Sequence, residues 1–290
     1  MTRPLPRLVA SRTAALLMGL ALTAGCSSQA VTAGDPAGSA GRTATSPRMS
    51  STPPPSPPAA PATGACRQLD YAAISRYSNG DPTVSCKAPH TAYTFAVQSL
   101  PSDVKIAGVS IGNKSVQDAA AQGCRAAFAG FIGGNPAERA LSRLSVTYFL
   151  PDQQGFNLGA TWVRCDVVAL KTANTLASLP DKLNGLLDDP KSLHDFGVCS
   201  KGTPGAATSG LVMCTEKHTY RAEAALRLGS TSAGYPGIAA AGKGGQKLCS
   251  GYLTRTLGAG SGYTFGWTYP TASDWAAGQR FGYCWLKSTR

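Results

Sequence analysis

Two consecutive stretches of this chain show the alternating and helical apolar patterns of a folded module. In residues 64–175, alternation predicts strands over four ranges: 83–86, 91–100, 145–150 and 160–170. Between the second and third of these ranges, Cys124, Phe128 and Ile132 recur at fourfold spacing. This spacing predicts a helix over residues 119–132 with one apolar face.

Two sets of polar residues predict where helices of the first module begin. Ser115 to Asp118 resembles a capping box that leads into the long helix. Asn135, Pro136 and Glu138 predict a second, shorter helix, because proline is favoured in the first turn.

The same order of elements recurs in residues 176–290 in less space. Strands are predicted near Val212 and over 218–228, 263–269 and 279–286, and a helix over 246–257. Residues 177–190 read as a polar loop or a short helix. The chain is therefore predicted to have an α+β fold with two tandem disulfide-stapled modules, each a small antiparallel sheet with one main helix.

Each module ends in a motif of proline, aromatic residue, glycine and cysteine at one spacing. Two sets correspond without a gap: Pro151, Phe156, Gly159 and Cys165 in the first module, and Pro270, Trp275, Gly278 and Cys284 in the second. The shared spacing indicates duplication and a stapled turn between two strands. Trp267, Thr271 and Arg280 are distinctive to the second copy, which makes them candidate binding residues. The competing structural hypothesis is that Arg280 pairs with Asp274 across the turn.

The N-terminal segment carries the features of an export signal. Residues 1–25 contain three arginines, a short apolar run and small residues before Cys26, which predicts a signal peptide too short to span a membrane. Residues 23–26, which end in Cys26, resemble a bacterial lipobox. We expect Cys26 to be acylated and to hold the protein on the extracytoplasmic face of the cell membrane, with plain secretion or an uncleaved anchor as alternatives. Residues 26–63 then form a lipidated cysteine and a disordered linker rich in Pro, Ser, Thr and Ala.

Eight cysteines follow Cys26, four in each module. In an exported protein an even number of cysteines predicts disulfides, and no Cys-x-x-Cys pair supports a zinc site. Each set of four allows three pairings. We expect the local pairing, in which the first cysteine bonds to the second and the third staples the helix to the returning strand: Cys66 with Cys86, Cys124 with Cys165, Cys199 with Cys214, and Cys249 with Cys284.

The net charge is +12, and it becomes +9 once the three arginines of the signal peptide are removed. This basic balance favours anionic lipid headgroups or wall polymers as partners, although mild positive charge is as often only a solubility feature. No cluster of Lys and Arg with interleaved aromatic residues predicts nucleic-acid binding. We expect no cofactor and no metal.

Two further motifs leave alternative functions open. His90 and His218 each follow the second cysteine of their module by four residues. They are either structural or ligand-facing, and in the second case the protein is a small-ligand sensor with its site between the modules. Ser110 lies in a Gly-x-Ser-x-Gly string, which is the basis for a serine hydrolase alternative. That motif requires a strand, a sharp turn and a helix in a parallel sheet, so we expect no enzyme.

The motifs that surround His90 and Cys284 resemble those of a known family. Cys86-Lys-Ala-Pro-His90, and the second-copy motif from Trp267 to Cys284, are similar to the septum formation family of actinobacterial membrane-anchored and lipoprotein envelope proteins. The resemblance covers most of residues 64–290, and the first copy departs from it by carrying Phe156 in place of tryptophan. It implies an extracytoplasmic protein linked to cell division or envelope assembly, with no catalytic activity to carry over. The lipobox-like end, the linker, the tandem modules and the absence of a complete catalytic set in the sequence lead us to expect a non-enzymatic binding or scaffold protein. Its expected partners are envelope or division proteins or wall polymers.

Overall fold

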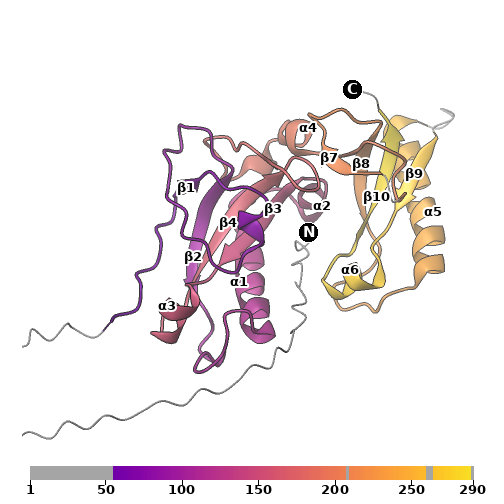
Figure 1. The fold of residues 1–290 in the computed structure, drawn as a ribbon. Helices are drawn as coiled ribbons and strands as arrows, with labels where there is room; N and C mark the ends of the chain where they lie inside the picture. The colour runs from indigo at the N-terminus through magenta and orange to yellow at the C-terminus, as the bar shows by residue number, and fades with distance from the viewer. Residues whose placement is uncertain (1–54, 207–208, 259–263, 289–290) are drawn as a thin grey trace, which may run out of the picture. The chain divides into compact units, whose positions relative to one another are not determined.

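The structure of the chain is a computed structural model that describes residues 55–206, 209–258 and 264–288. The described residues form two antiparallel sheets, each with one long helix (Figure 1). Together with four disulfides, these elements confirm the predicted α+β fold class. The predicted signal peptide, Cys26 and the linker up to residue 54 lie outside the described residues.

The first sheet has the strand order β1-β2-β4-β3, with β5 paired to β4. Its strands are β1 (Cys66–Arg67), β2 (Ala92–Ser99), β3 (Leu144–Phe149), β4 (Trp162–Leu170) and β5 (Leu176–Ala177). The long helix α1 (Lys114–Ile132) packs on one face of β2, β3 and β4 (Figure 1). Its buried side chains include Cys124, Phe128 and Ile132, as the fourfold spacing predicted.

The helix starts of the first module differ in how well the sequence predicted them. α1 begins at Lys114, and the Asn113 side chain accepts the backbone N–H of Ser115 at 2.9 Å. The predicted capping box at Ser115 is therefore wrong, because Asn113 already satisfies the first turn. The short helix α2 (Pro136–Ala140) has the predicted reciprocal cap between Asn135 and Glu138.

A long loop covers the other face of the first sheet. It contains the single helical turn η1 (Ala73–Ser75), and it buries Leu69 and Ile74 against Phe149 and Val168. The strand predicted over 83–86 is reduced to one bridge between Val84 and Cys66. The sheet is thus covered on both faces, by α1 and by this loop.

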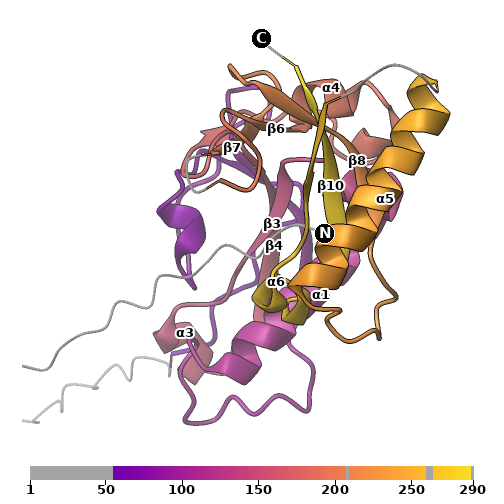
Figure 2. The ribbon, with the colours of Figure 1, turned by 90° about the vertical axis from the view of Figure 1, so that its right-hand side faces the viewer.

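The second sheet has the strand order β7-β6-β8-β10-β9. Its strands are β6 (Val198–Ser200), β7 (Leu211–Met213), β8 (Tyr220–Arg227), β9 (Phe265–Thr268) and β10 (Phe281–Lys287). The long helix α5 (Ile238–Leu257) runs along one face of this sheet (Figure 2) and buries Ala241, Cys249 and Leu253. It begins earlier than the predicted start at residue 246, because alanines and glycines extend the helix without adding apolar periodicity.

Four disulfides join the same cysteines that the sequence led us to expect: Cys66–Cys86, Cys124–Cys165, Cys199–Cys214 and Cys249–Cys284. The second bridge joins α1 to β4, and the fourth joins α5 to β10. In each sheet the long helix is therefore tied covalently to the strand on which it packs.

The repeated motif forms a short helix in both places, where the sequence predicted a turn. The two helices are α3 (Gln153–Asn157) and α6 (Ala272–Ala276). Each is followed by a glycine in the left-handed region, with φ of 95° at Gly159 and 91° at Gly278. The motif glycine is needed because side chains are strained at such φ values.

The segment that follows β4 packs onto the first sheet. β5 pairs with β4, and Leu179, Leu183 and Leu187 belong to the first core, although residues from 176 on were assigned to the second module from the sequence. Two one-turn helices, η2 (Leu186–Asp188) and α4 (Ser192–Phe196), lead to β6.

The buried core and the disulfides that stabilise the described fold all lie within residues 56–290. Every buried apolar residue of the described ranges, and all four disulfides, follow residue 64. The end of the linker adds one contact, a hydrogen bond of 3.3 Å from the Trp162 indole to the Pro58 carbonyl. The fragment 56–290 is therefore suited to measurements of folding. None of the helices in the described ranges has the length and hydrophobicity that crossing a membrane requires.

Candidate functional site

The two equivalent histidines are buried in matching backbone environments. Nδ1 of His90 lies 2.9 Å from the Ala88 carbonyl, and Nδ1 of His218 lies 2.7 Å from the Glu216 carbonyl. Their side chains are 1% and 7% exposed. Because a carbonyl only accepts, Nδ1 carries the proton in each ring. Both histidines thus close a local turn through Nδ1, whereas Nε2 of His90 is buried and has no hydrogen-bond partner among the described residues.

Trp267 fills a slot between a helix and a strand of the second sheet. Its indole N–H donates to the Ala241 carbonyl of α5 at 3.1 Å. A Cβ added to Gly245 would lie 1.9 Å from the Trp267 ring, and one added to Gly282 would lie 2.3 Å from it. The two glycines therefore make room for the indole, which is a packing role for Trp267.

We expect Gly245→Ala to lower the free energy of unfolding by about 1–3 kcal/mol, the usual cost of overpacking a filled core. The matched control is Gly244→Ala in the same helix, where an added Cβ meets nothing within 4 Å. That change should stabilise by up to about 1 kcal/mol, because alanine favours helix more than glycine does. Urea denaturation of the 56–290 variants measures both. Equal effects at the two positions would contradict the packing role.

Thr271 and Arg280 hold the short helix α6 in place. The Thr271 hydroxyl and the Asp274 carboxylate form a reciprocal cap at its start. The guanidinium of Arg280 lies 4.2 Å from the Trp275 ring centre. It donates to the carbonyls of Ser230, Thr231, Trp275 and Gln279. Arg280 therefore does not form the pair with Asp274 proposed from the sequence, because carbonyls already use its donors.

Ser110 does not lie in a nucleophile elbow. It is exposed in the loop before α1, and its hydroxyl accepts the N–H of Gly112 at 3.1 Å. No strand precedes it in that loop, and the paired strands of both described sheets are antiparallel. The hydrolase alternative therefore lacks the preceding strand and the parallel sheet that its motif requires. Within the described ranges, no group of His, Cys, Asp and Glu is placed to hold a metal ion.

A buried charge network, which sequence reasoning missed, lies under the loop that covers the first sheet. Nε of Arg164 is 3.1 Å from the Asp166 carboxylate, and their side chains are 2% and 0% exposed. The Thr94 hydroxyl donates to Asp166 at 2.7 Å and accepts from Arg67 at 2.9 Å. Arg164 also donates to the carbonyl and the side-chain oxygen of Asn79. Opposite charges two residues apart in an apolar strand are the signal that could have revealed the network, since such residues share a face.

Burial dominates the electrostatics of this pair. It raises the pKa of Asp166 and lowers the pKa of Arg164, because the cost of desolvation outweighs the attraction between the charges. Such a pair fixes geometry more than it adds stability. We therefore interpret the network as a device that positions the covering loop on the sheet.

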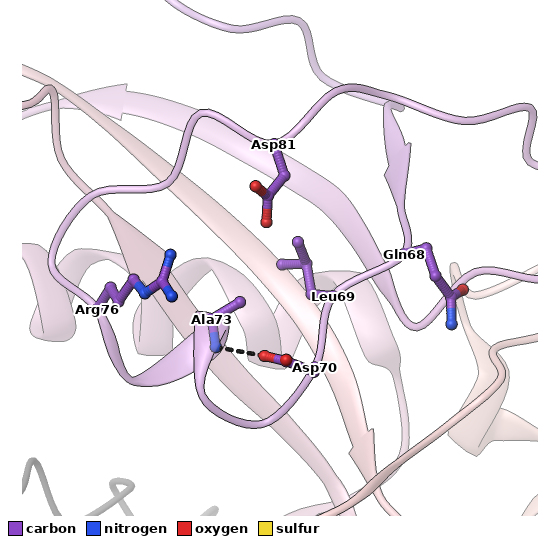
Figure 3. A pocket seen from close by; sticks show the side chains of 6 residues that line it. All are labelled: Gln68, Leu69, Asp70, Ala73, Arg76 and Asp81. Atoms are coloured by element: carbon purple, nitrogen blue, oxygen red, sulfur yellow. Dashed lines mark hydrogen bonds between the residues drawn. The ribbon is translucent and has the colours of Figure 1, made fainter.

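A pocket of about 320 Å³ lies in the covering loop beside this network. Figure 3 shows Asp70, Arg76 and Asp81 around Leu69, with the Asp70 carboxylate accepting the Ala73 N–H. The Asp81 carboxylate accepts from Asn79 at 2.8 Å. Both carboxylates thus already cap local structure, which disfavours the pocket as a binding site.

A larger groove of about 1010 Å³ is lined by residues of both sheets. Ten residues of the motif segment line it: Thr268, Tyr269, Pro270, Thr271, Ser273, Asp274, Ala277, Gln279, Phe281 and Tyr283. Among its described lining residues, Arg143 and Asp274 are the charged ones. Five aromatic residues also line it: Tyr71, Tyr269, Phe281, Tyr283 and Trp285.

The groove also contains a buried polar group with no protein partner. The Ser145 side chain is 1% exposed, and its hydroxyl makes no hydrogen bond to the described residues. Unpaired buried hydroxyls are uncommon, and such a group is satisfied by water or by a ligand. Grooves of this volume that combine apolar walls with polar groups commonly bind ligands.

The described residues form a disulfide-stapled α+β fold with a groove that is lined by residues of both sheets. A family profile described as septum formation matches residues 63–284, and the chain belongs to this septum formation family. The match runs as one stretch through both sheets, so it does not by itself establish two copies of the family domain. Searches of curated proteins and of solved structures found no match.

Proposed function

We propose that this protein is a non-enzymatic envelope lipoprotein that binds a partner during septum formation through the groove. Membership of the septum formation family supports the cellular process. The observation that carries the binding role is that the family-like motif segment lines a groove of about 1010 Å³. The chemistry of this groove fits a largely uncharged, extended segment of an envelope or division protein.

The proposed location is the extracytoplasmic face of the cell membrane, with Cys26 as the acylated residue. Two features support this location. The first is the signal peptide with its lipobox-like end. The second is the set of four disulfides, which persist in oxidising compartments. The linker would then allow the folded part to reach a partner away from its anchor.

We also propose that the two modules arose by duplication. The matching geometry of the two histidines, the helix-to-strand disulfides and the left-handed glycines Gly159 and Gly278 supports this origin. The residues next to the equivalent cysteines show that the modules then diverged. Cys165 lies between Arg164 and Asp166, whereas Cys284 lies between Tyr283 and Trp285.

The proposal is tested by locating the full chain in dividing cells. An epitope tag at the C-terminus and immunofluorescence should show enrichment at septa, and deletion of the gene should give abnormal septa that the tagged chain restores. Uniform distribution around the cell, together with normal septa after deletion, would remove the proposed role.

A further inference from the structure

The end of the linker is held against the first module at two places. Gly64 joins the first sheet, where its N–H donates to the Thr94 carbonyl of β2 at 2.8 Å. Six residues earlier in the chain, the Pro58 carbonyl accepts the indole N–H of Trp162 at 3.3 Å. Trp162 pairs with Ser99 of β2, five residues beyond Thr94. Five residues of a strand cover about 16 Å and six residues of polyproline II reach about 19 Å, so the linker end is close to fully extended.

The Pro58 ring lies in a space that a glycine leaves open. A Cβ added to Gly155 of α3 would lie 2.5 Å from Cγ of Pro58 and 3.0 Å from its Cδ. The next atom, Oδ1 of Asp152, would be 3.2 Å away, a distance that a small shift relieves. The backbone of Gly155 does not itself require glycine, because its φ lies outside the left-handed region. The missing side chain therefore makes room for the proline ring.

The second module lacks both parts of this contact. By the spacing that the two copies of the motif share, Asp274 stands where the first module has Gly155, so that position carries a Cβ. Phe281 stands where the first module has Trp162, and a phenyl ring has no N–H to donate. Only single prolines precede the second module, whereas residues 53–58 contain five. The glycine, the indole and the proline run thus occur together before and within the first module.

We propose that Gly155 and Trp162 form a polyproline site that holds the chain's own linker at Pro58. A polyproline II helix has no internal hydrogen bonds, so its carbonyls are free to accept from an indole N–H. Aromatic side chains commonly receive proline-rich segments. The chain's own linker is favoured over a proline-rich segment of another molecule, because its attachment at Gly64 keeps its local concentration in the millimolar range.

Docking of the linker sets where the tether leaves the folded part. A docked linker leaves beside α3, whereas an undocked one would leave at the start of β1. For the anchored protein this direction matters only with the acylation of Cys26 proposed above, but the contact itself does not depend on acylation or on the groove.

The test measures the backbone order parameters of Ala59 and Ala60 by nitrogen NMR relaxation in the 56–290 fragment. We expect values of about 0.85, as for rigid backbone, in the unchanged fragment. Gly155→Ala should lower them below about 0.6, the range of flexible backbone, because the added Cβ displaces the Pro58 ring. Trp162→Phe should lower them too, because it keeps an aromatic ring but removes the donor.

The matched control is Gly130→Ala in α1 of the same module, where an added Cβ meets nothing within 4 Å. It should leave both order parameters unchanged. Urea denaturation separates release of the linker from loss of the fold, and all three variants should keep the cooperative unfolding of the unchanged fragment.

Two results would overturn the proposal directly: flexible values in the unchanged fragment, or rigid values in Gly155→Ala. A free peptide with the sequence of residues 52–63, added at about 0.1 mM, should leave the order parameters unchanged, because it cannot compete with the tethered copy. A fall on adding this peptide would show that the site serves segments of other molecules, which overturns its assignment to the chain's own linker.

Discussion

Replacing Asp166 with Asn is expected to lower the free energy of unfolding of the 56–290 fragment by about 3–5 kcal/mol, the typical cost of breaking a buried ion pair from one side. The change leaves the guanidinium of Arg164 buried without its counter-charge. It also weakens the link from Asp166 through Thr94 to Arg67. Urea denaturation followed by circular dichroism measures the loss.

Two controls separate this explanation from a general effect of removing a carboxylate. Asp118→Asn removes a carboxylate from the exposed pair with Lys114 and should cost no more than about 0.5 kcal/mol. The double change Arg164→Met and Asp166→Val should recover most of the loss, because an apolar pair avoids desolvation altogether. A double variant as unstable as Asp166→Asn would show that the network stabilises the fold beyond positioning the loop.

Removing the disulfide between α1 and β4 is expected to cost about 4 kcal/mol, which is the loop-entropy value for a separation of 41 residues. The variant is Cys124→Ala with Cys165→Ala, in which both positions lie in the core of the first sheet. The entropy that the bridge removes from the unfolded chain grows slowly with the length of the closed loop.

The comparison variant for the disulfide is Cys199→Ala with Cys214→Ala. That bridge closes 15 residues, so its removal should cost about 3 kcal/mol. Denaturation midpoints of the two double variants, measured without reductant, test the order. A loss below about 1 kcal/mol for the longer loop would mean that α1 packs on β4 without help from the bridge.

The elements predicted best from the sequence are those whose signal is local. α2 was predicted from Asn135, Pro136 and Glu138, and these residues form its cap. The core face of α1 was predicted from Cys124, Phe128 and Ile132. Periodicity and capping act over a few residues, so the pattern that specifies them is visible in the sequence. The start of α5 was missed because its first turns contain small residues with weak periodicity.

The roles of the candidate site residues depend on contacts that the sequence does not show. The sequence suggested two possible partners for Arg280, the Asp274 carboxylate or a ligand. In the structure its guanidinium instead donates to the carbonyls of Ser230 and Thr231, which lie about fifty residues earlier in the chain. Trp267 read as a recognition residue, and only the structure shows that Gly245 and Gly282 leave space for its ring. The groove was missed for the same reason, since its wall combines residues of both sheets.

The central claim is that the groove binds the partner through which the protein acts at the septum. The most direct measurement compares Ala277→Trp, which fills the groove at an exposed lining position, with Ala276→Trp, an exposed neighbour that does not line it. Both variants are expressed as full chains in the deletion strain, and unfolding of the matching 56–290 fragments confirms that both are folded. The account predicts that Ala276→Trp enriches at septa and restores them, whereas Ala277→Trp spreads around the cell and leaves septa abnormal. Normal enrichment and restored septa with Ala277→Trp would contradict it.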